Sequence, residues 1–432
     1  MAHVSDLIAT DIDAYLDAHQ HKSLLRFITC GSVDDGKSTL IGRLLYDSKM
    51  IFEDQLAALE ADSKRIGTQG GEIDFALLVD GLAAEREQGI TIDVAYRFFS
   101  TDKRKFIVAD TPGHEQYTRN MVTGASTADL AVILIDARKG VLTQTRRHSF
   151  LVSLIGIRSV VLAVNKMDLV GFDQAVFDEI VADYRAFASE IGLTEVLAIP
   201  ISGLKGDNIA SRSDLTPWYD GPSLMRHLET VEIDAARLQS GPLRMPVQWV
   251  NRPNLDFRGF AGTISGGAIA AGDRIVVLPS GQTSEVARIV TYDGDLERAV
   301  AGQSITLTLT DEIDVSRGDV IARPNHQPIV AQQLDAMICW MTDKPLAPGG
   351  RYALKHTTRW TRAIVDSIAF GLDVNTGEHR DVDQLGLNDL GRVRLRTTTP
   401  VIVDPYSHNR TTGSFILVDE ATNTTVAAGM LV

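Results

Sequence analysis

The first half of the chain alternates between two hydrophobic patterns. Short apolar runs, typical of buried strands, are separated by segments in which apolar residues recur every three or four positions, as on the covered face of a helix. Between Ser23 and about Ile233 this alternation predicts a doubly wound α/β domain with a mostly parallel sheet. The strands are expected at 24–30, 92–100, 105–110, 129–136, 159–165 and 196–201, and the helices at 37–46, 53–63, 114–124, 143–156, 173–191 and 223–230.

The pattern changes after Gly241 and Pro242, where apolar and polar residues begin to alternate in short stretches separated by turn residues. A period of two, interrupted by glycine-rich turns, predicts small all-β barrels. A first block of strands is expected at Met245–Val250, Phe260–Ser265, Asp273–Leu278, Ser284–Thr291 and Ser304–Thr310, and a second at Gln333–Met341, Arg351–Lys355, Arg362–Ala369, Gly391–Thr397 and Phe415–Asp419. With an apolar helical stripe over 4–18, the expected domains are an N-terminal helix and linker (1–22), the α/β domain (23–235) and two β-barrel domains (241–325 and 328–432).

The 432-residue chain carries a formal net charge of -14, from 42 basic and 56 acidic residues. An acidic surface repels nucleic acids and anionic membranes, so neither is expected as a partner. No apolar run reaches membrane-spanning length, and no cleavable leader is expected. Cys30 and Cys339 lie in separate apolar stretches, so the sequence favours a reducing, cytoplasmic environment over a disulfide framework.

Residues 31–38 read GSVDDGKS, which matches the phosphate-binding pattern of Gly, four residues and Gly-Lys-Ser/Thr. An apolar run precedes this loop and a helical pattern follows it. Glycines let the backbone approach a phosphate closely, successive N–H groups point at it, and the helix presents its positive end. Lys37 is expected to reach the β- and γ-phosphates, and the Ser38 hydroxyl is expected to ligate Mg²⁺.

Two further segments follow in the order of a GTP-binding domain. REQGIT over 86–91 places Thr91 to give a hydroxyl to Mg²⁺ and an N–H to the γ-phosphate. DTPGH over 110–114 directly follows an apolar strand, and the carboxyl ends of strands are where α/β sheets bind ligands. Asp110 is expected to hold Mg²⁺ through water, and Gly113 lets a peptide N–H approach the γ-phosphate closely. Mg²⁺ is therefore assigned to Ser38, Thr91 and Asp110.

Two later segments are expected to bind the base. NKMD over 165–168 ends another apolar strand, and the Asp168 carboxylate can accept hydrogen bonds from guanine N1–H and the 2-amino group. Adenine offers neither donor, so this segment selects guanine. Asn165 can bond the base edge, the Lys166 stem can cover its face, and a backbone N–H of SGL at 202–204 can donate to guanine O6. The expected nucleotide contacts are Gly31, Ser32, Val33, Asp34, Asp35, Gly36, Lys37, Ser38, Thr39, Asp110, Gly113, Asn165, Lys166, Asp168, Ser202, Gly203 and Leu204.

Phosphoryl transfer also requires an oriented water, beyond positioning and charge neutralisation. His114, immediately after the third segment, is the candidate for this role, and the alternative is a histidine with a purely structural function. Lys37 and Thr91 complete the expected catalytic set. Val33 and Ile90 are hypothesised to form an apolar gate that keeps His114 from the γ-phosphate until a partner acts.

These five segments, with the histidine after Asp-Thr-Pro-Gly and two β-rich domains behind them, resemble the translation-factor GTPase superfamily typified by elongation factor Tu. Asp35 departs from that group, which usually has histidine at this place. Other stretches are similar to one branch, the large GTP-binding subunit of bacterial two-subunit sulfate adenylyltransferase (ATP sulfurylase). They are 27–45, 62–65, 84–96, 117–121, 136–141, 311–319 and a second-domain loop at Asn251–Gly259.

The resemblance implies that GTP hydrolysis drives formation of adenosine 5′-phosphosulfate and diphosphate from ATP and sulfate, at a separate small subunit of the ATP-pyrophosphatase type. No Ser-Gly-Gly-x-Asp-Ser loop of that type is found, and Ser265–Ala270, which begins like one, is expected to be a hairpin turn. Some family members carry a fused adenylylsulfate kinase, and none is expected before Val432. Two alternatives stay open: an elongation-factor-like carrier of aminoacyl-tRNA and a GTP-dependent scaffold.

A basic, aromatic-interleaved patch is expected in the third domain. It has three readings: a solvated strand face, a contact with the small subunit or its anionic substrates, or an RNA contact, which the net charge disfavours. Its members are Arg351, Lys355, His356, Arg359, Trp360 and Arg362.

Overall fold

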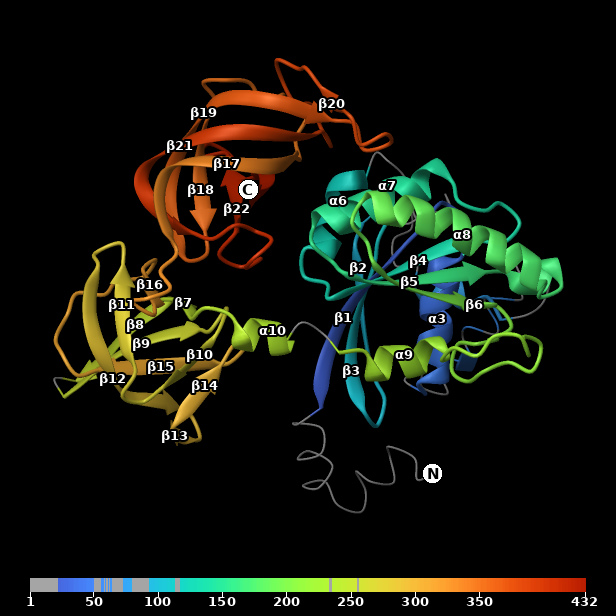
Figure 1. The fold of residues 1–432 in the computed structure, drawn as a ribbon, viewed down its shortest axis with the longest axis horizontal. Coiled ribbons are helices and arrows are strands. Elements are labelled where there is room, and N and C mark those ends of the chain that lie inside the picture. The colour runs from blue at the N-terminus through green and yellow to red at the C-terminus, as the bar shows by residue number, and fades with distance from the viewer. Residues whose placement is uncertain are drawn as a thin grey trace. The chain divides into compact units, whose positions relative to one another are not determined.

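The computed structural model describes residues 22–49, 56, 57, 59, 61, 63, 73–79, 93–112, 117–232, 235–254 and 256–432. The chain divides into two compact units, Met1–Ile233 and Asp234–Val432 (Figure 1). The helix expected within 1–22 lies outside the described residues, whereas residues 56, 57, 59, 61 and 63 of the helix expected at 53–63 are helical. In the described part of the chain, no helix combines the length and apolar character needed to cross a membrane.

A six-stranded sheet forms the centre of the first unit, in the order β2-β3-β1-β4-β5-β6. The strands are β1 (Ser23–Cys30), β2 (Ala95–Ser100), β3 (Arg104–Asp110), β4 (Leu130–Asp136), β5 (Ser159–Asn165) and β6 (Glu195–Pro200). β2 is antiparallel to β3, and the other neighbouring pairs are parallel. The register pairs Thr29 with Asp110 and Asp136 with Asn165, so the carboxyl ends of β1, β3, β4 and β5 meet at one edge.

Helices cover both faces of this sheet, which explains why every residue of β4 is buried. Leu40 and Leu44 of α3 and Leu224 of α9 share one core with Leu25 and Phe27 of β1. In Figure 1, α6, α7 and α8 lie on the other side of the sheet from α3 and α9. The helical segments of this unit are α3 (Lys37–Asp47), η1 (Phe75–Leu78), α6 (Thr118–Ala125), α7 (Thr143–Leu154), η3 (Met167–Val170), α8 (Gln174–Glu190) and α9 (Leu224–Thr230).

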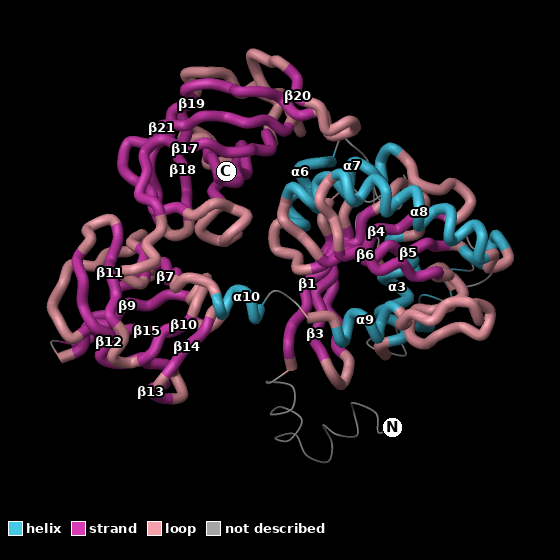
Figure 2. Tube along the Cα trace, viewed as in Figure 1, coloured by secondary structure: helices cyan, strands magenta, loops and turns pink. Residues whose placement is uncertain are grey.

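The second unit is built almost entirely of strands, apart from α10 (Ala235–Ser240) (Figure 2). Its first sheet has the order β7-β16-β11-β12-β15-β9-β8, with β13 paired to β12, and β10 pairs with β14. Backbone bonds from Arg244 N to Gly266 O and from Ser265 N to Arg244 O tie β7 back to the chain after β9. These strands are β7 (Arg244–Pro246), β8 (Trp249–Asn254), β9 (Phe257–Thr263), β10 (Ala268–Ala270), β11 (Arg274–Leu278), β12 (Gln282–Thr291), β13 (Gly294–Leu296), β14 (Arg298–Val300), β15 (Ser304–Leu309) and β16 (Val320–Ala322).

The second sheet of this unit closes into a barrel, because β18 pairs with β22 at one end of the strand order and with β19 near the other. The closed path is β18-β22-β23-β17-β21-β19, and β20 extends from β19. Closure leaves no free edge among these six strands. The seven strands of this sheet, β20 included, are β17 (Ile329–Trp340), β18 (Arg351–His356), β19 (Arg359–Leu372), β20 (His379–Arg380), β21 (Leu390–Val403), β22 (Ser414–Val418) and β23 (Thr425–Leu431).

The expected fold class, an α/β GTPase domain followed by β-barrel structure, is confirmed. Some details of the prediction were wrong, and one strand expected at Met245–Val250 is divided between β7 and β8. Asn251–Gly259 is not a loop, since most of it belongs to the antiparallel hairpin of β8 and β9. Several strands were not predicted, the longest being β23, whose stretch TVAAGML is rich in small residues that seldom predict a strand.

Candidate nucleotide-binding site

The phosphate loop connects β1 to α3, as the sequence predicts. Gly36 precedes the helix with φ 93°, a left-handed conformation that favours glycine. An ideal Cβ on Gly36 would lie 2.5 Å from Asn165 Nδ2, and one on Gly31 would lie 2.7 Å from Leu134 O. Both glycines are therefore required by space as well as by backbone conformation, and the loop is packed directly against β4 and β5.

Lys37 lies inside this loop with only 7% of its surface exposed. Its Nζ donates to Gly31 O at 3.1 Å and to Ser32 O at 2.8 Å. Burial lowers the pKa of Lys37, while the carboxylates of Asp110 and Asp35 act in the opposite direction. The result is a cation held at the start of a helix, which is the arrangement that binds a phosphate.

Ser38 and Asp110 meet at the carboxyl edge of the sheet. Ser38 Oγ donates to Asp110 Oδ2 at 3.2 Å, and Thr29 Oγ1 donates to Asp110 Oδ1 at 3.1 Å. Asp110 is buried at the end of β3. A hydroxyl and a carboxylate side by side are hard oxygen ligands of the kind that Mg²⁺ prefers, so these two residues fit the ion.

Asn165 and Gly203 connect the base-binding segments to the phosphate loop. Asn165 Nδ2 donates to Asp35 O at 2.7 Å, and Gly203 N donates to Asn165 Oδ1 at 2.9 Å. Ser202 Oγ accepts from Lys205 N at 3.1 Å, and Leu204 O accepts from Arg43 at 3.3 Å, so this turn is held from both sides. The fourth and fifth segments are therefore brought together with the first.

Lys166 adopts a left-handed backbone conformation with φ 62°. Its Nζ donates to Asp34 O at 2.5 Å and lies 3.0 Å from Asp136 Oδ2. Asp168 follows on η3 and is half-buried. Val33 and Thr39 are also half-buried, the first in the loop and the second in the first turn of α3.

The structure adds Asp136, which the motif analysis did not assign. Its buried carboxylate accepts from Arg138 Nη2 at 2.7 Å as well as from Lys166. Burial acts to raise its pKa, but the hydrogen bonds from Arg138 and Lys166 prevail and hold the pKa well below the usual range. A signal was available in the sequence, because Asp136 ends an apolar strand just as Asp110 does.

His148 on α7 is a second residue that the sequence did not single out. The Gly31 N–H donates to its Nδ1 at 3.1 Å, 117 positions away in the chain. Burial, with the charges of Lys37 and Arg147, lowers the pKa of His148 to about 3, so the ring is neutral and can accept this bond. A histidine within an ordinary helical pattern gives no sequence signal of such a contact.

Three expected site residues, Thr91, Gly113 and His114, lie outside the described residues, as does Ile90 of the hypothesised gate. Their roles remain predictions. The described residues of the phosphate loop, the third segment and the two base-binding segments do come together at one edge of the sheet.

The predicted basic patch is only partly present on the surface, because two of its members are engaged inside the protein. His356 is buried, with Nε2 bonded to Thr412 O at 2.8 Å, and Arg359 donates to Pro400 O at 2.9 Å and pairs with Asp319. Lys355 lies over the exposed Trp360 ring, with Nζ 5.5 Å from its centroid. Successive side chains along β18 and β19 point to opposite faces of the sheet, so some of the basic residues point inward. The order of residues in the sequence does not show which ones.

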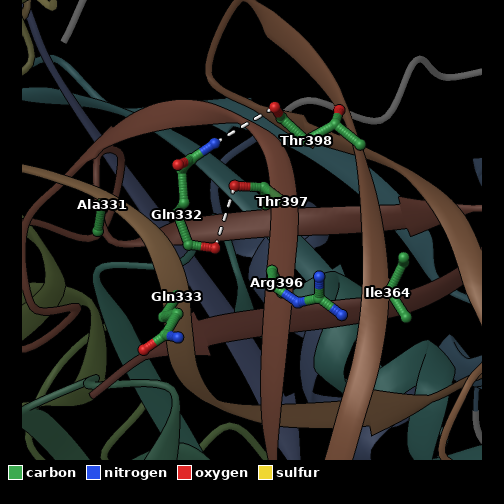
Figure 3. Close-up of a pocket in the computed structure, with 7 residues that line it drawn as sticks. All are labelled: Ala331, Gln332, Gln333, Ile364, Arg396, Thr397 and Thr398. Carbon is green, nitrogen blue, oxygen red and sulfur yellow. Dashed lines mark hydrogen bonds between the residues drawn. The ribbon is translucent and has the colours of Figure 1, made fainter.

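A pocket on β17, β19 and β21 is a weaker candidate site (Figure 3). Its charged residue, Arg396, lies 3.3 Å from Asp366 Oδ1. Gln332 Nε2 donates to Thr398 O at 3.3 Å, and Thr397 Oγ1 donates to Gln332 O at 3.3 Å. Arg396, Gln332 and Thr397 are thus engaged with their own neighbours rather than converging on a ligand.

Comparison with known proteins agrees with this geometry. Residues 22–245 match the family "Elongation factor Tu GTP binding domain", and residues 333–432 match "GTP-eEF1A C-terminal domain-like". Sulfate adenylyltransferase subunit 1 of Aliarcobacter butzleri is 59% identical over 432 residues, covering 100% of this chain and 92% of the relative. The bifunctional enzyme CysN/CysC of Rhodopirellula baltica is 60% identical over 434 residues, covering 100% of this chain and 67% of the relative.

Among solved structures, sup35 complexed with GDP aligns with 95% of this chain and 94% of its own, at 24% identity and a TM-score of 0.44, a likeness that carries no weight for function. The family match over the first unit and the relatives that match the whole chain are sufficient to assign the family. The chain belongs to the elongation factor Tu family of GTP-binding proteins and, within it, to the sulfate adenylyltransferase subunit 1 branch.

Proposed function

We propose that this chain is the GTP-hydrolysing subunit of a heteromeric sulfate adenylyltransferase. Hydrolysis of GTP drives the formation of adenosine 5′-phosphosulfate and diphosphate from ATP and sulfate at a partner subunit. The observation that carries the proposal is the junction of Lys37, the Ser38–Asp110 pair and Asn165 at one edge of the sheet, in a chain 59% identical to a sulfate adenylyltransferase subunit 1.

GTP binding is proposed to use the phosphate loop, the base-binding segments and the predicted contacts of Thr91, Gly113 and His114. Lys37 and the N–H groups at the start of α3 neutralise the β- and γ-phosphates. The Asp168 carboxylate accepts from guanine N1–H and the 2-amino group and excludes adenine. His114 orients the attacking water, and Thr91 and Gly113 contact the γ-phosphate.

Mg²⁺ fits the oxygen groups of Ser38 and Asp110, with Thr91 as the third proposed ligand. When bound, the ion supplies neutralisation of charge on the β- and γ-phosphate oxygens. In this chain Thr29 Oγ1 holds the other oxygen of Asp110, which fixes the orientation of that carboxylate.

The partner is proposed to be a small subunit of the ATP-pyrophosphatase type. The name of these relatives, subunit 1, is consistent with a second chain. The proposed division of the chain is a GTP-binding domain at 23–235 and β-barrel domains at 241–325 and 328–432.

The proposed site of action is the cytoplasm, which agrees with two free, buried cysteines, Cys30 and Cys339.

The test combines the full chain with the small subunit, ATP and sulfate, and measures diphosphate release. We expect a strong increase with GTP and none with a non-hydrolysable GTP analogue. Diphosphate release that is the same with and without GTP would show that the two reactions are not coupled.

His114 has its own test. His114→Ala should retain GTP binding, because the side chain acts on water rather than on the nucleotide, and should lose about 100-fold or more of the partner-stimulated hydrolysis. Single-turnover release of phosphate from GTP measures this. Hydrolysis at the wild-type rate would remove His114 from the mechanism.

A further inference from the structure

Asp35 places a carboxylate inside the phosphate loop, and its side chain is almost completely buried, at 1% exposure. Asp35 Oδ2 accepts the Ser32 N–H at 2.6 Å, while the Asp35 N–H donates to Ser32 O at 3.3 Å. The two bonds run in opposite directions between the same two residues. Together they clamp the turn of the loop, and the shorter bond depends on the Asp35 side chain.

The residue held by this clamp also holds Lys37. Ser32 O accepts from Lys37 Nζ at 2.8 Å, next to the Gly31 carbonyl. An ideal Cβ on Gly31 would lie 3.1 Å from Asp35 Oδ2 and 2.7 Å from Leu134 O, so the carboxylate lies on the side of the loop that faces β4. The direction of the Ser32 carbonyl, and the position of the cation bonded to it, depend on the clamp.

Asp35 is connected to the base side of the site as well. Its carbonyl accepts from Asn165 Nδ2, and Asn165 Oδ1 accepts from Gly203 N. A chain of hydrogen bonds thus runs from Ser32 through Asp35 and Asn165 to the turn that is expected to meet guanine O6.

We propose that the Asp35 side chain is a positioning residue for guanine-nucleotide binding, which clamps Ser32 from the β4 side and thereby fixes the position of Lys37 for the phosphates. This inference rests on the proposed function. Two buried polar atoms of the same turn, Asp35 Oδ1 and Ser32 Oγ, have no hydrogen-bond partner among the described residues. A turn that leaves such groups unsatisfied is unfavourable for stability, as is common at functional positions.

The experiment measures release of N-methylanthraniloyl-GDP from the full chain during a chase with unlabelled GDP. Asp35→Ala should release the nucleotide about tenfold faster or more, the effect of losing a hydrogen bond to a charged acceptor. Asp35→Asn should stay within about threefold of wild type, because its amide oxygen can still accept the Ser32 N–H. Asp178→Ala, at an exposed position on α8, is the matched control and should not change release.

Comparing the effects on KM and on kcat distinguishes a positioning role for Asp35 from a general loss of folded protein. In Asp35→Ala the KM for GTP should rise by about tenfold or more while kcat at saturating GTP changes much less, because the clamp acts on binding. Should Asp35→Ala fail to fold, as judged by thermal melting, Asp35→Leu takes its place, since leucine has a similar shape and no acceptor.

Each outcome decides the inference. Nucleotide release at the wild-type rate from Asp35→Ala or Asp35→Leu would overturn the inference. Release from Asp35→Asn as fast as from Asp35→Ala would also overturn it, because a hydrogen-bond acceptor at this position would then be irrelevant. If the wild-type chain itself bound no GDP, the proposed function would fail, and the inference would fail with it.

Discussion

Asn165 joins two loops through the two atoms of its amide. Its Nδ2 donates to the Asp35 carbonyl and its Oδ1 accepts from Gly203, at a site that is 2% exposed. Each amide atom can form one more hydrogen bond, so the predicted contact with the base edge remains possible alongside these two. The two contacts inside the protein by themselves account for an asparagine at this position.

Asp168 leads to a prediction about base selection. Asp168→Asn replaces an acceptor by a donor, which opposes the N1–H and 2-amino donors of guanine but suits the carbonyl of xanthine. We expect GTP affinity to fall by about 100-fold or more and xanthosine triphosphate to bind better than GTP. Competition against a fluorescent nucleotide measures both, with Asp178→Asn as control. Unchanged GTP affinity would contradict the assignment of Asp168 to the base.

Asp35 leads to a prediction about stability and pH. Burial raises its pKa to about 6 from 3.8, against the opposing effects of Lys37 and the Ser32 N–H. The folded chain therefore binds the proton more tightly than the unfolded chain, and the free energy of unfolding falls as pH rises from about 4 to 6. Asp35→Asn cannot ionise and avoids this loss.

At pH 7.5 we expect the free energy of unfolding of Asp35→Asn to exceed that of wild type by about 1–3 kcal/mol. At pH 4.5 we expect the difference between the two to be smaller. Thermal melting of both chains at the two pH values measures the difference. An equal difference at both pH values would mean that the Asp35 carboxyl does not titrate abnormally.

Elements in the first unit follow the hydrophobic pattern closely because each apolar run has a defined place in the sheet. β4, β5 and α8 begin and end within two residues of their predicted bounds. In the second unit β19 and β21 extend well past the predicted ends, to 14 residues each. Pairing with neighbours carries these strands through polar stretches that a pattern of period two does not mark.

Gly42 leads to a prediction at the scale of α3. The helix packs on η1 so closely that a Cβ on Gly42 would lie 2.1 Å from Phe75 O, a backbone atom that cannot rotate away. Alanine favours a helix over glycine by about 1 kcal/mol, but overpacking costs about 1–3 kcal/mol. Gly42→Ala should therefore lower the melting temperature.

The matched control is Ser189→Ala, at an exposed position of α8, which should change stability by less than about 0.5 kcal/mol. A melting temperature for Gly42→Ala equal to or above that of wild type would show that α3 and η1 are not in this close contact.

In the second unit as a whole, an ion pair joins the two sheets. Arg244 Nε and Nη2 donate to Asp404 at 2.8 and 2.9 Å, and Arg244 Nη1 donates to the carbonyls of Leu243 and His326. The Thr412 hydroxyl donates to the same carboxylate at 2.6 Å. An apolar cluster packs across the same junction and consists of Val276, Leu278, Val320, Ala322 and Ile402.

We predict that removing one partner of the Arg244–Asp404 pair destabilises the second unit. Asp404→Ala leaves the Arg244 guanidinium, 5% exposed, without its carboxylate, and should lower the free energy of unfolding by about 3–5 kcal/mol. Asp366→Ala, which breaks the exposed pair with Arg396, should cost less than about 1 kcal/mol. Denaturant unfolding of both variants measures the contrast, and equal losses would mean that burial of the Arg244 pair is unimportant.

Order and spacing along the chain are sufficient to predict the phosphate loop and the change from α/β to β structure, whereas the guanine-binding role of residues 165–168 stays a prediction. They are local properties, because each depends on residues a few positions apart and on hydrophobic periods of two or 3.6. The family and the fold class follow from them.

Tertiary structure alone decided which side chains support those segments. The Gly31–His148 bond, the Asn165 bridge to Asp35 and the Arg244–Asp404 pair join residues more than 100 positions apart. Such contacts depend on which strands become neighbours, and the alternation along β18 and β19 likewise decided that His356 points inward. Sequence by itself determined the family, the fold class and the phosphate loop, and the packing of distant strands and helices determined which side chains hold that loop in place.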